Sequence, residues 1–155
     1  AEIGRAFGMD VVVHDPKPPV VTPSHVSFDE LIETSDIITL HCPLTPETRG
    51  FIAMEQFRRM KKKPLIVNTA RGGLIVEEDL LAALDQGLVG GAGLDVTLPE
   101  PPPVGGSFMK LAAHPKVVVT PHTAWASIEA QQTLADQLID NVENFAAGRP
   151  SNVVG

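Results

Sequence analysis

Three side chains that could bind a small acid and move a proton on it each follow an apolar run of the sequence: Arg71 as the binding group, and Glu100 and His122 as acid–base candidates. Arg71 stands in a polar turn, residues 68–73, directly after the apolar run 65–67 and next to two glycines. A guanidinium can bind a carboxylate through two parallel hydrogen bonds, and a histidine can give and take a proton near neutral pH. Together these groups could hold a small acid and move a proton on it. Taken alone, Arg71 could equally pair with a surface carboxylate.

The surrounding pattern predicts the elements that position these groups. Apolar runs predict strands over residues 10–14, 36–41, 65–67, 90–96 and 116–120. Helical patterns between them predict a helix end over 1–8 and helices over 54–60 and 77–86, with further helices capped by Ser27 and Ser127. The alternation predicts an α/β fold, a doubly wound parallel sheet (Rossmann-like) with helices on both faces. A flavodoxin-like strand order is the alternative. The carboxyl ends of parallel strands share one edge, so Arg71, Glu100 and His122 are expected to line one cleft there.

Composition narrows the classes of function. The chain has 155 residues, 43% hydrophobic and 20% charged, which is typical of one globular domain. A net charge of −7 without a basic stripe argues against nucleic-acid binding, and no apolar run has membrane length. Cys42 is the one cysteine, so no internal disulfide can form, and a reducing, cytoplasmic location is expected. The remaining histidines lack metal-ligand spacing, so no metal site is expected.

Asp15 ends the first predicted strand. In dinucleotide-binding units such an acid accepts hydrogen bonds from the ribose hydroxyls and repels a 2′-phosphate, which favours NAD over NADP. The alternative is that Asp15 only begins an Asp-Pro turn. The fingerprint glycines of such units precede the acid by about 20 residues, and Gly4 is too close to be one of them. The phosphate loop and the first strand are therefore expected to lie upstream of Ala1.

Several short motifs, taken in order, resemble one family. They are residues 7–9 (FGM), 14–16 (HDP), 35–45 (SDIITLHCPLT), 68–73 (NTARGG), 91–96 (GAGLDV), the pair at 100–101 (EP) and 120–122 (TPH). Over residues 7–154 the chain resembles the cofactor domain of the D-isomer-specific 2-hydroxyacid dehydrogenases. Residues 122–127 (HTAWAS) are most similar to the glycerate dehydrogenase, or hydroxypyruvate reductase, branch.

The resemblance implies catalytic roles for three residues. Arg71 would bind the substrate carboxylate and carbonyl oxygen, because a guanidinium fork suits two acceptors. His122 would donate a proton to the carbonyl oxygen as the hydride arrives from the reduced cofactor, and Glu100 would hold the imidazole through its other nitrogen.

The resemblance also implies a cofactor site. Asp95 would meet the nicotinamide end, and Arg71 and His122 would face the cofactor as well as the substrate. The residues expected on the adenosine and ribose side are Asp15, Cys42, Pro43, Thr48, Thr69 and Ala70. A reactive Cys42 thiol is an alternative reading, but no base is paired with it in the sequence.

The implied function is NAD-dependent oxidation and reduction of D-2-hydroxy acids and 2-oxo acids, with hydroxypyruvate and glycerate as examples. Residues 1–155 would form an N-terminally truncated NAD-binding domain without the substrate domain, inactive alone and associating as a homodimer. The alternative is a non-catalytic binding or dimerisation domain. Thr97 stands where the family usually has an aromatic residue, and Glu77 also departs from the family pattern. Neither is expected to touch the chemistry.

Overall fold

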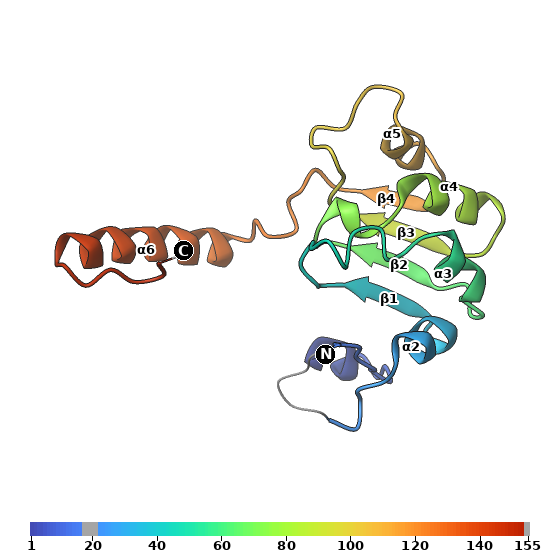
Figure 1. The fold of residues 1–155 in the computed structure, drawn as a ribbon, viewed down its shortest axis with the longest axis horizontal. Helices are drawn as coiled ribbons and strands as arrows, with labels where there is room; N and C mark the ends of the chain where they lie inside the picture. Colours follow the sequence, from blue (N-terminus) through green and yellow to red (C-terminus); the bar gives the residue numbers. More distant parts are fainter. Residues whose placement is uncertain (17–21, 154–155) are drawn as a thin grey trace. The chain divides into compact units, whose positions relative to one another are not determined.

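The computed structural model describes residues 1–16 and 22–153. Within it the chain forms two compact units, Ala1–Val119 and Thr120–Gly155, which are described separately here. The first unit holds the sheet and its helices, and the second holds one long helix (Figure 1).

Four parallel strands form the sheet of the first unit. They are β1 (Ile37–Leu40), β2 (Leu65–Asn68), β3 (Gly91–Leu94) and β4 (Val117–Val119), in the order β1-β2-β3-β4. Asn68 is paired with Leu40 on one side and Leu94 on the other, so the ends of the three strands are aligned. The α/β class and the parallel sheet predicted from the sequence are confirmed.

Helices connect the strands. They are α1 (Glu2–Ala6), α2 (Phe28–Thr34), α3 (Met54–Arg59), α4 (Glu77–Asp85) and α5 (Ser107–Ala112), with a 3-10 turn, η1, at Gly72–Leu74. Ser27 caps α2 as predicted, since its hydroxyl accepts a hydrogen bond from the Glu30 N–H. Gly8, with φ of +76°, follows α1 and ends it. The sequence did not predict α5 or η1.

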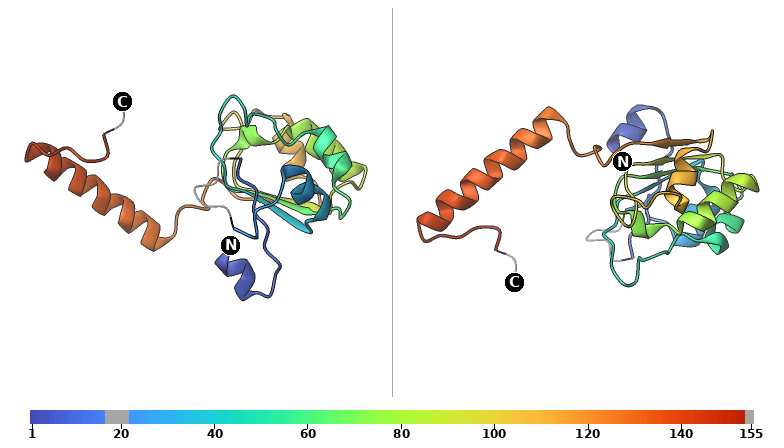
Figure 2. Two further views of the ribbon diagram at one scale, coloured as in Figure 1. Left: turned by 60° about the horizontal axis from the view of Figure 1, so that its bottom comes forward. Right: turned by 90° about the horizontal axis from the view of Figure 1, so that it is seen from above.

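The core lies between the sheet and one layer of helices. In Figure 2, α3, α4 and α5 lie on the same side of the sheet. On that side Ile38, Leu40 and Ile66 are buried, whereas Ile37 and Leu65 on the opposite side are 46% and 48% exposed. Side chains alternate between faces along a strand. Within the described part of the first unit, α3, α4 and α5 therefore cover one face of the sheet and do not cover Ile37 and Leu65 on the other.

The prediction of a strand over residues 10–14 is wrong, because these residues do not join this sheet. Here Val13 makes only an isolated parallel bridge to His25, with its N–H bonded to the Ser24 carbonyl at 2.8 Å. A β-branched run forms a strand only where a neighbouring strand supplies hydrogen bonds along its length. Among the described residues β1, rather than residues 10–14, is the edge strand of the sheet.

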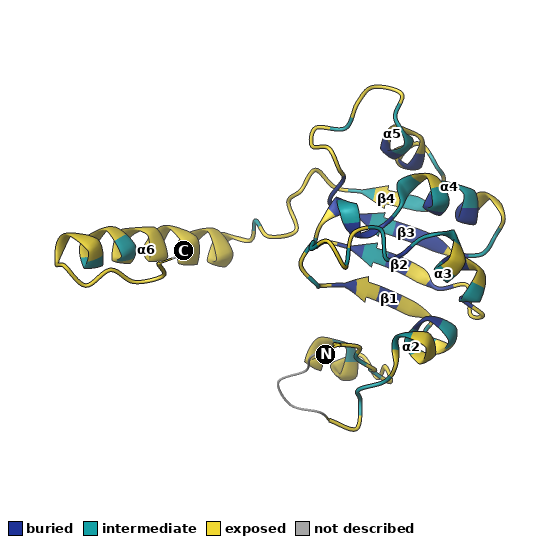
Figure 3. Ribbon diagram, viewed as in Figure 1, coloured by how far each residue is buried: buried dark blue, intermediate teal, exposed yellow. Residues whose placement is uncertain are grey.

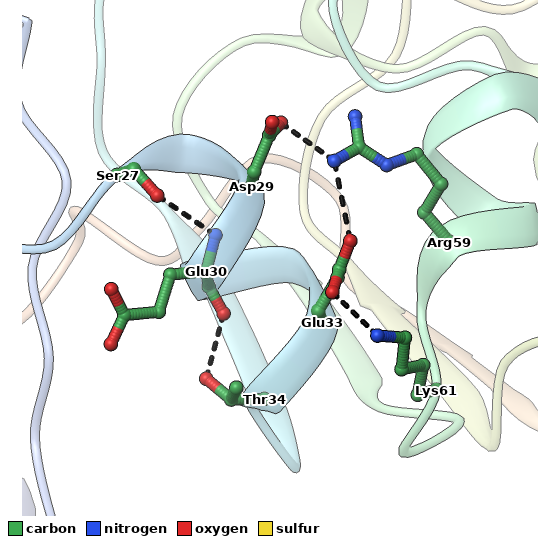
Figure 4. A network of polar contacts seen from close by, with 7 residues as sticks. All are labelled: Ser27, Asp29, Glu30, Glu33, Thr34, Arg59 and Lys61. Carbon is green, nitrogen blue, oxygen red and sulfur yellow. Dashed lines mark hydrogen bonds and ion pairs between the residues drawn. The ribbon is translucent and has the colours of Figure 1, made fainter.

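Charged side chains link α2 to α3 and the residues after it (Figure 4). The Arg59 guanidinium contacts Asp29 at 2.8 Å and Glu33 at 3.3 Å, and the Lys61 ammonium contacts Glu33 at 2.6 Å. Hydrogen bonds from Lys61 and Arg59 lower the pKa of Glu33. Because the cluster lies at the surface, its contribution to stability is modest and sensitive to salt.

The second unit consists of a loop, α6 (Ile128–Ala146) and a short tail. As predicted, Ser127 caps α6 by accepting a hydrogen bond from the Ala130 N–H at 3.1 Å. The apolar residues at helical spacing are exposed along the helix, as Figure 3 shows by its colouring. They include Leu134, Leu138, Val142 and Phe145, which are 57% to 75% exposed. Within the described residues no helix is both long and apolar enough to cross a membrane.

Candidate active site

Asn68 fixes the backbone turn that carries Arg71. Its side chain is 1% exposed and lies at the carboxyl end of β2. The amide nitrogen donates to the Arg71 carbonyl at 3.0 Å, and the amide oxygen accepts from the Ala70 N–H at 3.1 Å. The Asn68 carbonyl in turn accepts from the Asp95 N–H at 3.0 Å. These bonds join the ends of β2 and β3 and leave the Arg71 side chain exposed at the edge of the sheet.

Gly72 lets the Arg71 turn approach the residue that follows Val96. A Cβ placed on Gly72 would lie 2.1 Å from the carbonyl carbon of Thr97 and 2.4 Å from its Cα. Glycines beside an arginine can let backbone approach a ligand closely. At Gly72 the approaching group is the backbone of Thr97 itself. The Arg71 turn and the segment leading to Glu100 are thus packed directly together.

Glu100 is held close to this contact. One of its carboxylate oxygens accepts a hydrogen bond from the Thr97 N–H at 3.1 Å. The Thr97 hydroxyl donates to the Glu77 carboxylate at 2.6 Å. Neither Thr97 nor Glu77 was expected to touch the chemistry, yet Thr97 bonds to the proposed acid Glu100 and Glu77 bonds to Thr97.

A pocket beside the Arg71 turn brings together several predicted cofactor residues. It is lined by His41, Cys42, Pro43, Leu44, Ala70 and Arg71. Thr48 supports its wall by donating to the Pro43 carbonyl at 2.7 Å. Thr69 lies in the same turn and is exposed. Apolar walls with one cationic group at the rim suit a flat ring that carries phosphate or carboxylate groups.

Burial raises the pKa of the Cys42 thiol. A protonated thiol is a poor nucleophile, so the reactive-thiol alternative loses support. Asp95, by contrast, is a buried carboxyl group at 3% exposure, placed directly after β3 and bonded through its N–H to Asn68. Among the described residues no group of histidine, cysteine and carboxylate side chains could hold a metal ion.

Asp15 and His122 belong to other segments of the chain. Asp15 follows the isolated bridge at Val13, at the exposed N-terminal part of the first unit. His122 belongs to the second unit, so its approach to Arg71 and Glu100 stays a prediction. His122 adopts a φ of +55°, uncommon for a side chain with a Cβ, and its carbonyl accepts from the Trp125 indole at 3.0 Å.

Comparison with known proteins identifies the family. The model for the NAD binding domain of the D-isomer specific 2-hydroxyacid dehydrogenases matches residues 1–124. The chain belongs to this family. The resemblance inferred from the motifs, and the NAD-binding character inferred with it, are confirmed.

Two of the similar curated proteins carry related names. The chain is 49% identical to glycerate dehydrogenase of Methylorubrum extorquens over 154 residues, which is 99% of this chain and 48% of that protein. It is 43% identical to hydroxypyruvate reductase of Blautia hydrogenotrophica, again covering 99% and 48%. The chain thus spans about half the length of these curated relatives.

Solved structures of the family share the fold. A D-lactate dehydrogenase with NAD+ from Lactobacillus jensenii superimposes with a TM-score of 0.88 at 29% identity, covering 100% of this chain and 51% of that chain. A D-isomer specific 2-hydroxyacid dehydrogenase from Lactobacillus delbrueckii, in its NAD complexed form, gives 0.82 at 33% identity, covering 100% and 52%.

Sequence reasoning missed the residues that support the site. Asn68 and Gly72 were recognised as parts of a motif, but the buried amide and the close backbone approach were not foreseen. The signal for Asn68 was present, since a polar residue that ends a buried strand needs hydrogen-bond partners. No local signal marks Thr97 and Glu77, which lie on separate elements and meet only in the fold.

Proposed function

We propose that this chain is the cofactor domain of an NAD-dependent oxidoreductase acting on D-2-hydroxy acids and the matching 2-oxo acids. The single observation that carries the proposal is the Arg71 turn, which Asn68 fixes beside the pocket in a domain of NAD-binding character. The names of the relatives at 49% and 43% identity favour glycerate and hydroxypyruvate as the substrate pair.

The chain's own side chains then divide the work. Arg71 binds the substrate carboxylate and orients its carbonyl, since its guanidinium is exposed while its backbone is fixed. His122 holds the proton that is passed to the carbonyl oxygen and receives it back in oxidation. Glu100 orients the imidazole. When bound, the cofactor would supply the hydride in its reduced form, NADH, and accept it in its oxidised form, NAD+.

The cofactor would be held mainly by the walls of the pocket beside β2. Cys42, Pro43 and Ala70 line it with apolar surface, and Thr48 fixes its loop. Thr69 and Asp95 stand at the ends of β2 and β3, which is where parallel sheets hold their ligands. Asp15 would accept hydrogen bonds from the ribose hydroxyls and so set the preference for NAD.

Association as a homodimer forms part of the proposal. It is supported by the edge strand β1, whose outer backbone groups can accept another strand, and by the exposed Ile37 and Leu65 on one face of the sheet. The same surfaces support the alternative of a non-catalytic binding or dimerisation domain. Retention of Arg71, Glu100 and His122 favours the enzyme.

The test measures hydroxypyruvate reduction with NADH by the protein as its gene encodes it. His122→Ala should lower kcat by at least about a hundredfold, the usual scale for losing a general acid. Arg71→Lys should raise KM and lower kcat, because an ammonium cannot reproduce the fork. Arg58→Lys, on the exposed side of α3, is the matched control and should leave both constants unchanged. Wild-type activity in both active-site variants would rule out the proposed roles.

A further inference from the structure

Thr97 connects two carboxylates that lie on different elements. It is a buried residue, 7% exposed, in the segment that follows β3. Its hydroxyl donates to Glu77, the first residue of α4, at 2.6 Å, and its backbone N–H donates to Glu100 at 3.1 Å. A hydroxyl-to-carboxylate bond of that length is at the short, strong end of charge-assisted hydrogen bonds.

The same residue is confined from a second direction. Its backbone lies so close to Gly72 that no Cβ could be placed there without a clash. A shift of Thr97 toward the Arg71 turn is therefore blocked, and a shift away stretches the bond to Glu77. Since Glu100 is bonded to the N–H of Thr97, the position of its carboxylate follows that of Thr97.

We infer that Glu77 is a positioning residue of the active site, which acts through the Thr97 hydroxyl to hold Glu100 at a fixed distance from the Arg71 turn. The inference rests on the proposed function, in which Glu100 orients the imidazole of His122. Displacing a positioned group by about 1 Å can cost up to a hundredfold in rate, so such a clamp has a measurable kinetic effect.

A second hydroxyl–carboxylate pair provides the matched control. Ser107, the first residue of α5, donates to the neighbouring Glu78 of α4, also at 2.6 Å. This bond joins α4 to α5 with the same chemistry and the same length, but no hydrogen bond leads from Ser107 to Glu100 in the part of the chain that the structure describes. If such pairs served stability alone, removing either hydroxyl would leave turnover unchanged. If the Thr97 pair positions Glu100, removing the Thr97 hydroxyl would lower turnover and removing the Ser107 hydroxyl would not.

The experiment compares Thr97→Val and Ser107→Ala in the protein as its gene encodes it. We expect Thr97→Val to lower kcat for hydroxypyruvate reduction about tenfold while KM for NADH changes less than twofold. Thr97→Ser keeps the hydroxyl and should recover at least half of the wild-type kcat. Ser107→Ala should keep kcat within twofold. Glu77→Gln weakens the same bond from its other end and should lower kcat in the same direction.

A double-mutant cycle with Glu100→Gln separates the inference from the proposed function. If Thr97 acts through Glu100, adding Thr97→Val to Glu100→Gln should cause less than a twofold further loss. If Glu100→Gln alone keeps wild-type kcat, the proposed role of Glu100 fails and the inference fails with it. Two results overturn the inference alone when Glu100→Gln lowers kcat. One is that Thr97→Val has no effect on kcat in the wild-type background. The other is that Thr97→Val lowers kcat by the same factor in the Glu100→Gln background as in the wild type. The inference is also overturned if Thr97→Val and Glu77→Gln both fail to fold while Ser107→Ala folds.

Discussion

Replacing Gly72 by Ala tests the contact that joins the Arg71 turn to Thr97. The added Cβ would lie between 2.1 and 2.4 Å from the carbonyl carbon, carbonyl oxygen and Cα of Thr97. Carbon atoms in favourable contact are separated by about 3.5–4.0 Å. The gap is therefore short by more than about 1 Å, and the atoms in the way are backbone rather than the end of a flexible side chain.

Neither side of the contact can move cheaply. Thr97 is bonded to Glu77 and Glu100, and Asn68 fixes the turn on the other side. Overpacking of this kind costs about 1–3 kcal/mol, and the immobility of both partners places Gly72→Ala near 3 kcal/mol. With a urea dependence of about 2 kcal/mol per M, the unfolding midpoint should fall by about 1.5 M.

Gly93→Ala is the control for this substitution. Gly93 lies on β3, its φ is not in the left-handed region, and a Cβ there meets no heavy atom within 4 Å. The urea midpoint of Gly93→Ala should stay unchanged or rise slightly. Alanine lowers the entropy of the unfolded chain, which can raise the free energy of unfolding by about 0.4–1 kcal/mol. Urea unfolding followed by circular dichroism measures both variants. Equal midpoints for the two would refute the close approach of Gly72 and Thr97.

Three further outcomes are expected. Asn68→Ala leaves the Arg71 carbonyl and the Ala70 N–H without their partner and should destabilise the first unit by about 1–3 kcal/mol in thermal unfolding; an unchanged midpoint would contradict the role given to the amide. The pKa of Glu33 is lowered in the folded chain, so the stability from this group is complete above the ordinary glutamate pKa of about 4.3 and is lost as pH falls through the lowered value. Urea midpoints at pH 7 and pH 3 should therefore differ less in Glu33→Gln than in the wild type, and an equal difference would show that the cluster adds nothing. Asp15→Asn should narrow the preference for NADH over NADPH in the gene-encoded protein, whereas a native preference for NADPH would show that the assignment of Asp15 is wrong.

The sequence by itself determined the local elements and the family. Strands β1 to β4 and helices α3 and α4 lie within a few residues of their predicted bounds, and α2 and α6 begin at their predicted caps. Apolar periodicity and capping by Ser27 and Ser127 are local properties, so they can be recognised without the fold. The motif that carries Arg71 and the order of the other motifs were sufficient for the family, which the comparison confirmed.

Local pattern was insufficient where an element depends on its neighbours. The run 10–14 has the composition of a strand, but the described chain supplies it with one bridging partner only, His25. Helix α5 was missed because it has only six residues, directly after a proline- and glycine-rich stretch, and these are too few to show a helical period.

Only the tertiary structure decided how the site is supported. The approach of Gly72 to Thr97 and the bond from Thr97 to Glu77 join residues far apart in the chain. Gly72 after β2, Thr97 after β3 and Glu77 at the start of α4 come together only in the fold, and neither the glycine nor the threonine carries a sign of these contacts in its local sequence. The motifs therefore indicated which residues bear the proposed chemistry. The contacts of Thr97 with Gly72, Glu77 and Glu100 exist only in the folded chain.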